Sequence, residues 1–134
     1  MLDQYILRGR HSFKPRIDDD GDWIGAEQIL ELNKQYWLHS KILDIGKEKL
    51  NKKYRELNCQ FIPLTKEELL DIVNAGTQCV NEKKKSAVRK YFNYTPINQE
   101  EYQEIIKEIP KFNVDITKFL KNKKKTEYYY YSWW

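Results

Sequence analysis

Residues 128–134 read Tyr-Tyr-Tyr-Tyr-Ser-Trp-Trp, and they follow a lysine-rich segment at 121–125. Aromatic side chains bury large areas at a low entropic cost, whereas a cationic segment does not collapse on itself. The pattern therefore indicates an extended basic and aromatic C-terminal tail over 121–134 whose tip docks on a partner. The predicted partner-binding side chains are the six aromatic ones: Tyr128, Tyr129, Tyr130, Tyr131, Trp133 and Trp134.

Three kinds of partner fit such a tail: a protein, single-stranded nucleic acid or a membrane interface. Surfaces that bind nucleic acid usually interleave aromatic side chains with cations across a folded platform. Here the lysines come first and the aromatic residues follow as a block. We therefore expect protein subunits as the partner, in a homo-oligomer or a larger assembly, with nucleic acid as the second choice.

An apolar stripe at helical spacing lies upstream of the tail. Its members recur every seven positions, which is typical of one face of a helix. We predict one long or kinked helix over about 26–57, which would be about 48 Å long if it were unbroken. A compact chain of this size is only roughly 36 Å across, so this helix either protrudes or breaks near its central glycine. The stripe consists of Ile29, Tyr36, Leu43, Leu50 and Leu57.

Two further helix starts carry capping signals. In the first, the Thr65 hydroxyl is placed to accept from the N–H of Glu68, and the Glu68 carboxylate is placed to accept from the N–H of Thr65. In the second, Asn98 and Glu101 take the same two roles, and the helix is predicted to end before Pro110. The expected fold class is therefore all-α, a small helical bundle.

The chain divides into three segments by pattern. Residues 1–25 show no helical period and contain three glycines and a proline, so we expect an irregular N-terminal arm. Residues 26–120 form the predicted helical body, and residues 121–134 form the tail. A length of 134 residues is consistent with one domain that carries two arms.

The positive charge is concentrated at one end of the chain. The net charge is +4, and the four lysines and one glutamate of 121–134 account for +3, which leaves +1 for residues 1–120. The strongly basic body typical of nucleic-acid-binding domains is missing. A basic run over 83–90 is interpreted as a solvated helix face, although nucleic-acid contact there stays open. The residues expected to contact phosphate, if any do, are Arg8, Arg10, Lys14, Lys123, Lys124 and Lys125.

No segment resembles a targeting signal. The first residues lack the cationic start and apolar run of a signal peptide. No window approaches the ~20 apolar residues of a membrane span. Cys59 and Cys79 are expected to be reduced thiols. These features favour a location in a virion or in a host cytoplasm.

No motif points to catalysis. The segment 16–27 places acidic residues at several positions of a calcium loop, but Arg16 stands at the first position, where Ca²⁺ needs an anion. His39 lies on the apolar stripe and is expected to be a hydrogen-bonded core histidine, and Cys79 a buried thiol. We do not expect an enzyme, and no catalytic residue, metal ligand or cofactor is predicted.

Composition and architecture lead to two functional hypotheses. Abundant Lys, Asn, Ile and Tyr with little Ala is typical of an AT-rich genome, such as that of a low-GC bacterium, its phage or another virus. A helical body with an adhesive C-terminal tail resembles, in architecture alone, the ring-forming head–tail connector adaptors of tailed phages. The resemblance implies a non-enzymatic structural protein of a virion that docks on partner subunits through its arms. The alternative is a small regulator that binds nucleic acid or inhibits a host protein.

Overall fold

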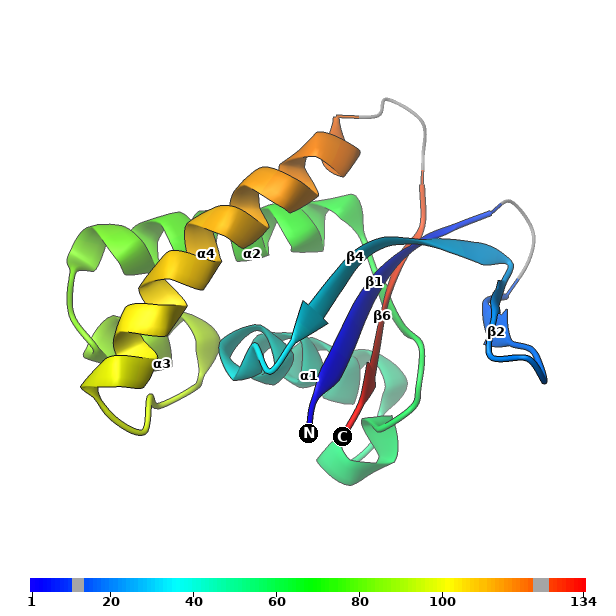
Figure 1. Ribbon diagram of the computed structural model, residues 1–134, viewed down its shortest axis with the longest axis horizontal. Coiled ribbons are helices and arrows are strands. Elements are labelled where there is room, and N and C mark those ends of the chain that lie inside the picture. Colours follow the sequence, from blue (N-terminus) through cyan, green and yellow to red (C-terminus); the bar gives the residue numbers. More distant parts are fainter. Residues whose placement is uncertain (11–13, 122–125) are drawn as a thin grey trace.

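The computed structural model describes residues 1–10, 14–121 and 126–134. It shows a mixed α/β fold built on a four-stranded antiparallel sheet with the strand order β4-β1-β6-β5 (Figure 1). The predicted all-α bundle is therefore wrong. One sheet joins residues from the predicted arm, body and tail, namely β1 (Asp3–Gly9), β4 (Ala26–Asn33), β5 (Ile62–Leu64) and β6 (Tyr128–Trp133).

The helices lie on one side of this sheet, and a small hairpin formed by β2 (Arg16–Ile17) and β3 (Trp23–Ile24) lies on the other (Figure 1). No helix in the described parts of the chain is both long and apolar enough to cross a membrane. The helical elements are α1 (Tyr36–Leu50), the short 3-10 helix η1 (Tyr54–Leu57), α2 (Lys66–Glu82), α3 (Ser86–Phe92) and α4 (Gln99–Leu120).

The predicted extended tail is instead an inner strand. Strand β6 pairs with β1 along its whole length and with β5 on its other side. Successive side chains of a strand point to opposite faces, so Tyr128, Tyr130 and Ser132 are buried against the helical layer. The same alternation turns Tyr129, Tyr131 and Trp133 to the outer face of the sheet. Aromatic residues favour strands, but four tyrosines in a row hide the period of two that identifies one.

The predicted long helix over 26–57 is also wrong. Residues 26–33 form β4, Lys34 turns the chain with φ at 54°, and α1 begins at Tyr36 and ends before Asn51, which has φ at 50°. The sequence of β4 alternates between apolar and polar side chains over part of its length, which is a strand pattern. The seven-residue recurrence therefore spans a strand, a helix and a 3-10 turn. Gly46 does not break α1.

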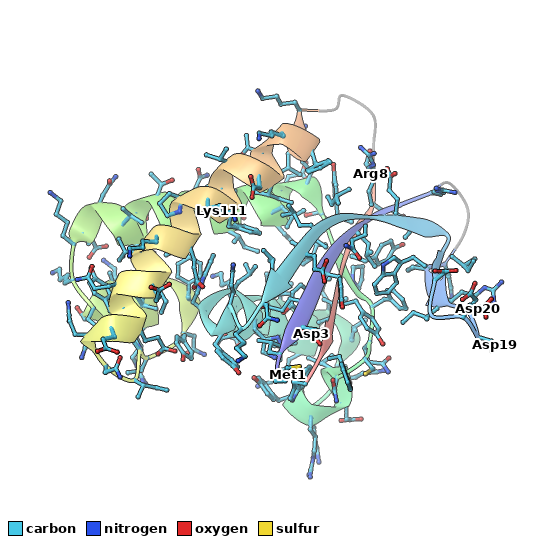
Figure 2. The ribbon with its side chains drawn as sticks, in the orientation of Figure 1. Met1, Asp3, Arg8, Asp19, Asp20 and Lys111 are labelled. Atoms are coloured by element: carbon cyan, nitrogen blue, oxygen red, sulfur yellow. The ribbon has the colours of Figure 1, made fainter. Side chains whose placement is uncertain are left out.

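The N-terminal segment is ordered rather than irregular. Strand β1 pairs with both β4 and β6, and a bulge between Ile6 and Leu7 shifts the register on the β4 side only. The acidic residues of the calcium-like segment 16–27 form the turn between β2 and β3. There Asp18 accepts hydrogen bonds from the N–H groups of Asp20 and Asp22. Asp20 lies at the tip of this hairpin, far from the helical layer (Figure 2).

Both predicted helix starts are confirmed. Thr65 accepts from the N–H of Glu68 at 3.0 Å and Glu68 accepts from the N–H of Thr65 at 2.9 Å. Asn98 accepts from the N–H of Glu101 at 2.9 Å. The predicted end before Pro110 is wrong, because α4 continues through it to Leu120. An internal proline costs a backbone hydrogen bond, but the residues on both sides of it keep one apolar face of the helix buried: Ile105, Ile109, Phe112, Ile116 and Leu120.

The core between the sheet and the helices fixes the start of α1 against α4. Trp37 is 1% exposed and packs edge-on against Phe92 of α3 and Phe112 of α4, with ring centroids 5.0 and 5.8 Å apart. Such edge-to-face pairs add stability beyond the area that they bury. The first turn of α1 is thereby held beside the first half of α4, where a cleft opens.

Candidate functional site

The six aromatic residues predicted to bind a partner do not form one surface. Tyr128 and Tyr130 are fully enclosed in the protein's own core, so neither ring is free to contact another molecule. Trp134 is pinned at its backbone, where Asn58 both accepts from its N–H and donates to its carbonyl at 3.0 Å. Only Trp133 is largely exposed, at 57%, while Tyr129 and Tyr131 are partly buried on the outer face of the sheet.

The outer face of the sheet carries a second, small aromatic core. Trp23 of the hairpin packs edge-on against Tyr5 and Tyr131, at 5.2 and 5.3 Å between ring centroids, and also approaches Phe61. These contacts attach the hairpin to the sheet. Burial, with the neighbouring carboxylates of Asp3 and Glu31, raises the pKa of Tyr5. An acidic surrounding disfavours phosphate at this face.

The predicted phosphate-contacting residues are not brought together either. Arg8 forms an ion pair with Glu27 and lies over the Phe119 ring at 6.0 Å, so its charge is already matched within the protein. Arg10 and Lys14 are exposed. Lys123, Lys124 and Lys125 lie outside the described residues.

His39 belongs to a buried polar cluster with a structural role, as its sequence position indicates. Its Nδ1 lies 2.8 Å from the Tyr130 hydroxyl, which also accepts from the Gln4 amide at 2.9 Å. The ring is covered by Trp134, at 4.7 Å between centroids. Burial lowers the pKa of His39 to about 4, so the ring is neutral at physiological pH. Cys79 is buried, and its pKa is raised to about 11 by burial first and Glu82 second, which leaves an inert thiol.

A cleft of about 690 Å³ lies between the start of α1, the connection after α3 and the first half of α4. We call it the acidic cleft. In Figure 1 the start of α1 is cyan and the first half of α4 is yellow. Three separate segments supply its walls: Lys34, Tyr36 and Trp37 from the start of α1, Tyr94 and Asn98 from the connection, and Glu100, Glu101, Gln103, Glu104, Ile105 and Glu108 from α4.

One carboxylate of the acidic cleft is structural. Glu101 accepts from the N–H of Ile97 and from the hydroxyl of Tyr94, both at 2.7 Å. The sequence predicted that Glu101 would reach back to Asn98, and it reaches one residue further. It thereby fixes the connection before α4 and the orientation of the Tyr94 ring.

Two other carboxylates keep unused acceptors. Glu108 accepts from the indole N–H of Trp37 through Oε1 at 3.1 Å, and no hydrogen bond engages its Oε2 within the described residues. Glu104 lies one helical turn earlier on the same face of α4 and is exposed. Within the described parts of the chain neither Glu104 nor Glu108 forms an ion pair. Both are therefore available to an incoming donor.

The electrostatics of the acidic cleft are strongly negative. Its four glutamates and one lysine give a local net charge of −3, in a chain whose total is +4. Burial raises the pKa of Glu108, and repulsion from Glu104 and Glu101 raises it further, although the hydrogen bond from Trp37 opposes both effects. None of the ion pairs among the described residues includes Glu108, so no cation offsets these effects.

Tyr36 and Tyr94, which we call the aromatic wall, line the same cleft as these carboxylates. The rings of Tyr36 and Tyr94 are nearly parallel, with 15° between their planes and 6.4 Å between their centroids. Tyr36 is 38% exposed, so part of its ring is open to solvent. Aromatic faces attract cations, and here they adjoin unpaired carboxylates. The arrangement fits an organic cation. No group of three or more His, Cys, Asp or Glu side chains that could hold a metal ion exists among the described residues.

The sequence alone did not predict this cleft. The sequence shows a series of glutamates at Glu100, Glu104 and Glu108. Acidic residues near the start of a helix stabilise its dipole, so this series alone does not indicate a binding site. The one local signal was the spacing of Glu101, Glu104 and Glu108, which places them on one helix face. Their aromatic neighbours come from segments about 10 and 70 residues away, and only the fold brings them together.

Comparison with known proteins identifies no relative: no family model, curated protein or solved structure matches the chain. The resemblance to head–tail connector adaptors is wrong, because it depended on an all-helical body and the protein has a central sheet. Nothing in the fold or in these comparisons supports the expected phage or viral origin, the virion role or an oligomer.

Proposed function

We propose that the protein is a non-enzymatic binding protein whose acidic cleft takes up a cationic segment of a partner protein. The observation that supports this most directly is the pair formed by Glu104 and Glu108. Both carboxylates have unused acceptors, and both line a cleft that also contains the aromatic wall. Carboxylates and aromatic rings together match what an ammonium or guanidinium group needs.

The local field supports a cationic ligand. A cleft lined by one sign of charge concentrates its field and attracts ligands of the opposite sign. The cleft has a net charge of −3, although the whole chain has a net charge of +4. A basic segment is therefore attracted only when it enters the cleft, and contact with the rest of the surface is not favoured. Partial burial strengthens this attraction, because hydrogen bonds to charged groups gain strength away from bulk water.

The alternative of a nucleic-acid-binding regulator has weaker support. The carboxylates of the acidic cleft repel phosphate, and the outer face of the sheet has acidic neighbours. The exposed cations of the described chain are scattered over the hairpin, α1, η1, the α2–α3 region and α4 rather than gathered in one patch, and Arg8 is paired with Glu27. A role in inhibiting another protein remains compatible with binding through the acidic cleft.

The proposal is tested by fluorescence anisotropy with a labelled peptide that alternates arginine, lysine and glycine. The full chain should bind it, and the double variant Glu104→Gln with Glu108→Gln should bind about tenfold or more weakly, because two charged acceptors are lost. The matched control is Glu67→Gln with Asp71→Asn, which removes two exposed charges one turn apart on α2. Its affinity should change about twofold at most.

Circular dichroism melts of all three proteins establish that they fold alike. Failure of the peptide to bind the full chain at millimolar concentration would contradict the proposal. An equal loss in the cleft variant and in the α2 control would do so too, because it would show that the peptide responds only to total charge.

A further inference from the structure

We propose that the group recognised in the acidic cleft is the guanidinium of an arginine side chain within an extended polypeptide. This inference rests on the proposed function, and it specifies the ligand of that same site. Four features of the cleft carry it: the geometry of its acceptors, its parallel aromatic faces, its partial burial and its volume.

The acceptors favour a group with several donors in one plane. The Trp37 indole N–H donates to Oε1 of Glu108 at 3.1 Å, which orients the carboxylate and leaves Oε2 without a hydrogen bond among the described residues. Glu104, one helical turn earlier on the same face of α4, adds a second carboxylate to the lining of the cleft. A guanidinium has five N–H donors in a rigid plane and can contact both carboxylates at once. An ammonium offers three donors from a single point.

The aromatic wall favours a planar cation. Tyr94 is fixed by its hydrogen bond to Glu101 at 2.7 Å, and Tyr36 lies nearly parallel to it. A guanidinium that stacks on an exposed ring face directs its N–H groups sideways, within its own plane, and so toward neighbouring acceptors. A tetrahedral ammonium contacts the same face with fewer atoms. Stacking on Tyr36 and hydrogen bonding to α4 are therefore compatible for arginine.

Partial burial favours the more weakly hydrated cation. Glu108 is hydrogen-bonded to the buried Trp37 and is itself only partly accessible to water. A cation that pairs with it must lose part of its hydration shell. The delocalised guanidinium is more weakly hydrated than an ammonium, so it loses less on entering. It also remains charged at every pH at which the protein is folded.

The volume indicates that the ligand is more than one side chain. The cleft measures about 690 Å³, within the range of about 300–1,000 Å³ that encloses ligands of drug size. Asn98 and Gln103 add polar side chains to its lining, which also includes the almost fully buried Ile105. These residues suit the backbone and the neighbours of an arginine in an extended peptide.

The test uses three pentapeptides, Gly-Gly-Xaa-Gly-Gly with blocked ends, in which Xaa is arginine, lysine or citrulline. Citrulline has nearly the shape of arginine without its charge. Binding to the ¹⁵N-labelled full chain is followed by NMR through the indole N–H resonance of Trp37, which reports on Glu108 because the two are hydrogen-bonded. Trp37→Phe assigns this resonance. The arginine peptide should bind about threefold or more tightly than the lysine peptide, and the citrulline peptide should leave the resonance unmoved.

A second variant tests the role of the aromatic wall. Tyr36→Leu removes an exposed ring and should abolish the preference for arginine over lysine while both peptides still bind. The matched control is Tyr54→Leu, which removes an exposed tyrosine outside the cleft and should leave the preference unchanged. Comparison of the two variants shows whether loss of any exposed tyrosine changes the preference for the arginine peptide.

The outcomes separate the two proposals. Equal binding of the arginine and lysine peptides, with both lost in the Glu104→Gln and Glu108→Gln double variant, overturns the choice of guanidinium and leaves the proposed function standing. Binding of the citrulline peptide as tightly as the arginine peptide overturns both, because charge would then be irrelevant. A Trp37 resonance that none of the peptides moves also overturns both.

Discussion

At the scale of single residues, the protonation state of His39 follows from its partners. Gln4 donates its amide to the Tyr130 hydroxyl oxygen, so the hydroxyl proton is free to be donated to His39 Nδ1 at 2.8 Å. Nδ1 therefore acts as an acceptor, and the imidazole is neutral. Protonation would require this hydrogen bond to reverse and would place a charge in a site where the residue is 3% exposed. The low pKa and the hydrogen-bond pattern agree.

The first prediction is that the free energy of unfolding decreases as the pH is lowered, because of His39. Its pKa is lowered from 6.5 to about 4 in the folded state, so below pH 6.5 the unfolded chain binds a proton that the folded protein excludes. The free energy of unfolding should therefore drop as pH falls from 6.5 toward 4, by at most about 1.4 kcal/mol per pH unit and about 2 kcal/mol at pH 5. Urea unfolding at several pH values measures it.

His39→Phe is the control for that prediction. This variant carries no ionisable group at position 39, so its free energy of unfolding should lack the His39 component between pH 6.5 and 5, whatever its absolute stability. The difference between the two proteins isolates His39 from the carboxylates that also titrate in acid. Parallel curves for both proteins would show that His39 is not excluded from protonation.

At the scale of elements, local signals in the sequence were sufficient for the helix starts and insufficient for the strands. The caps at Thr65 and Asn98 were predictable because each depends on side chains within three residues of the start. Strand β6 was not predictable in this way. Its identity depends on β1, more than 120 residues upstream, and four consecutive tyrosines show no alternation. Local periodicity does not encode pairing between the two ends of the chain.

The same limit explains the predicted helix over 26–57. An amphipathic helix produces a seven-residue recurrence of apolar side chains. The same recurrence can arise by chance when a strand and a helix follow each other in the chain. Gly46 was expected to be the weak point, yet it is a packing site. A Cβ at Gly46 would lie 2.9 Å from Ile62 Cδ1, so the glycine lets α1 approach β5 closely. The true break is at Lys34, where no proline or glycine marks the turn.

The second prediction concerns β6, and it follows from the position of this strand between β1 and β5. Deletion of residues 128–134 removes Tyr128 and Tyr130 from the core and leaves β1 without one of its two partners. The shortened chain should show no cooperative unfolding, because loss of two buried aromatic side chains alone costs about 3–5 kcal/mol each and typical domain stability is about 5–15 kcal/mol. Circular dichroism melts measure this.

Trp133→Ala is the matched control for the deletion. Trp133 belongs to the same strand but is 57% exposed, so its loss should cost about 1 kcal/mol or less. A shortened chain that melts cooperatively near the temperature of the full chain would show that the sheet tolerates loss of its inner strand. The position of β6 would then need revision.

At the scale of the whole molecule, the acidic cleft could not be predicted from the sequence, because three separate segments form it. Its carboxylates lie on α4, its exposed aromatic ring belongs to the start of α1, and Tyr94 comes from the connection between α3 and α4. The packing of Trp37 against Phe92 and Phe112 sets the distance between these segments. The sequence could identify acidic residues on one helix face. It could not identify what they face, because that depends on helix packing around the sheet.

The third prediction is that the acidic cleft costs stability when it is empty. The pKa of Glu108 is raised in the folded state, so the ionised carboxylate disfavours folding at neutral pH. Gln at this position keeps an oxygen for the Trp37 indole N–H without the charge. Glu108→Gln should therefore raise the free energy of unfolding at pH 7, as measured in urea, while it weakens binding of the arginine peptide. Gains in stability that accompany loss of function are expected at binding sites.

The sign of the pH dependence provides the check on that prediction. A group whose pKa is raised on folding contributes stability when protonated, and this contribution is lost as pH rises through its folded pKa. The advantage of Glu108→Gln should therefore be largest at neutral pH and should vanish as pH falls below 4.5, the ordinary value for glutamate. Burial sets this shift of the Glu108 pKa first, the hydrogen bond from Trp37 on α1 opposes it, and the carboxylates of Glu104 and Glu101 on α4 add to it. A variant that is less stable than the natural chain at pH 7 would mean that the cleft already neutralises Glu108, and the site would then have no unmet charge to offer a cation.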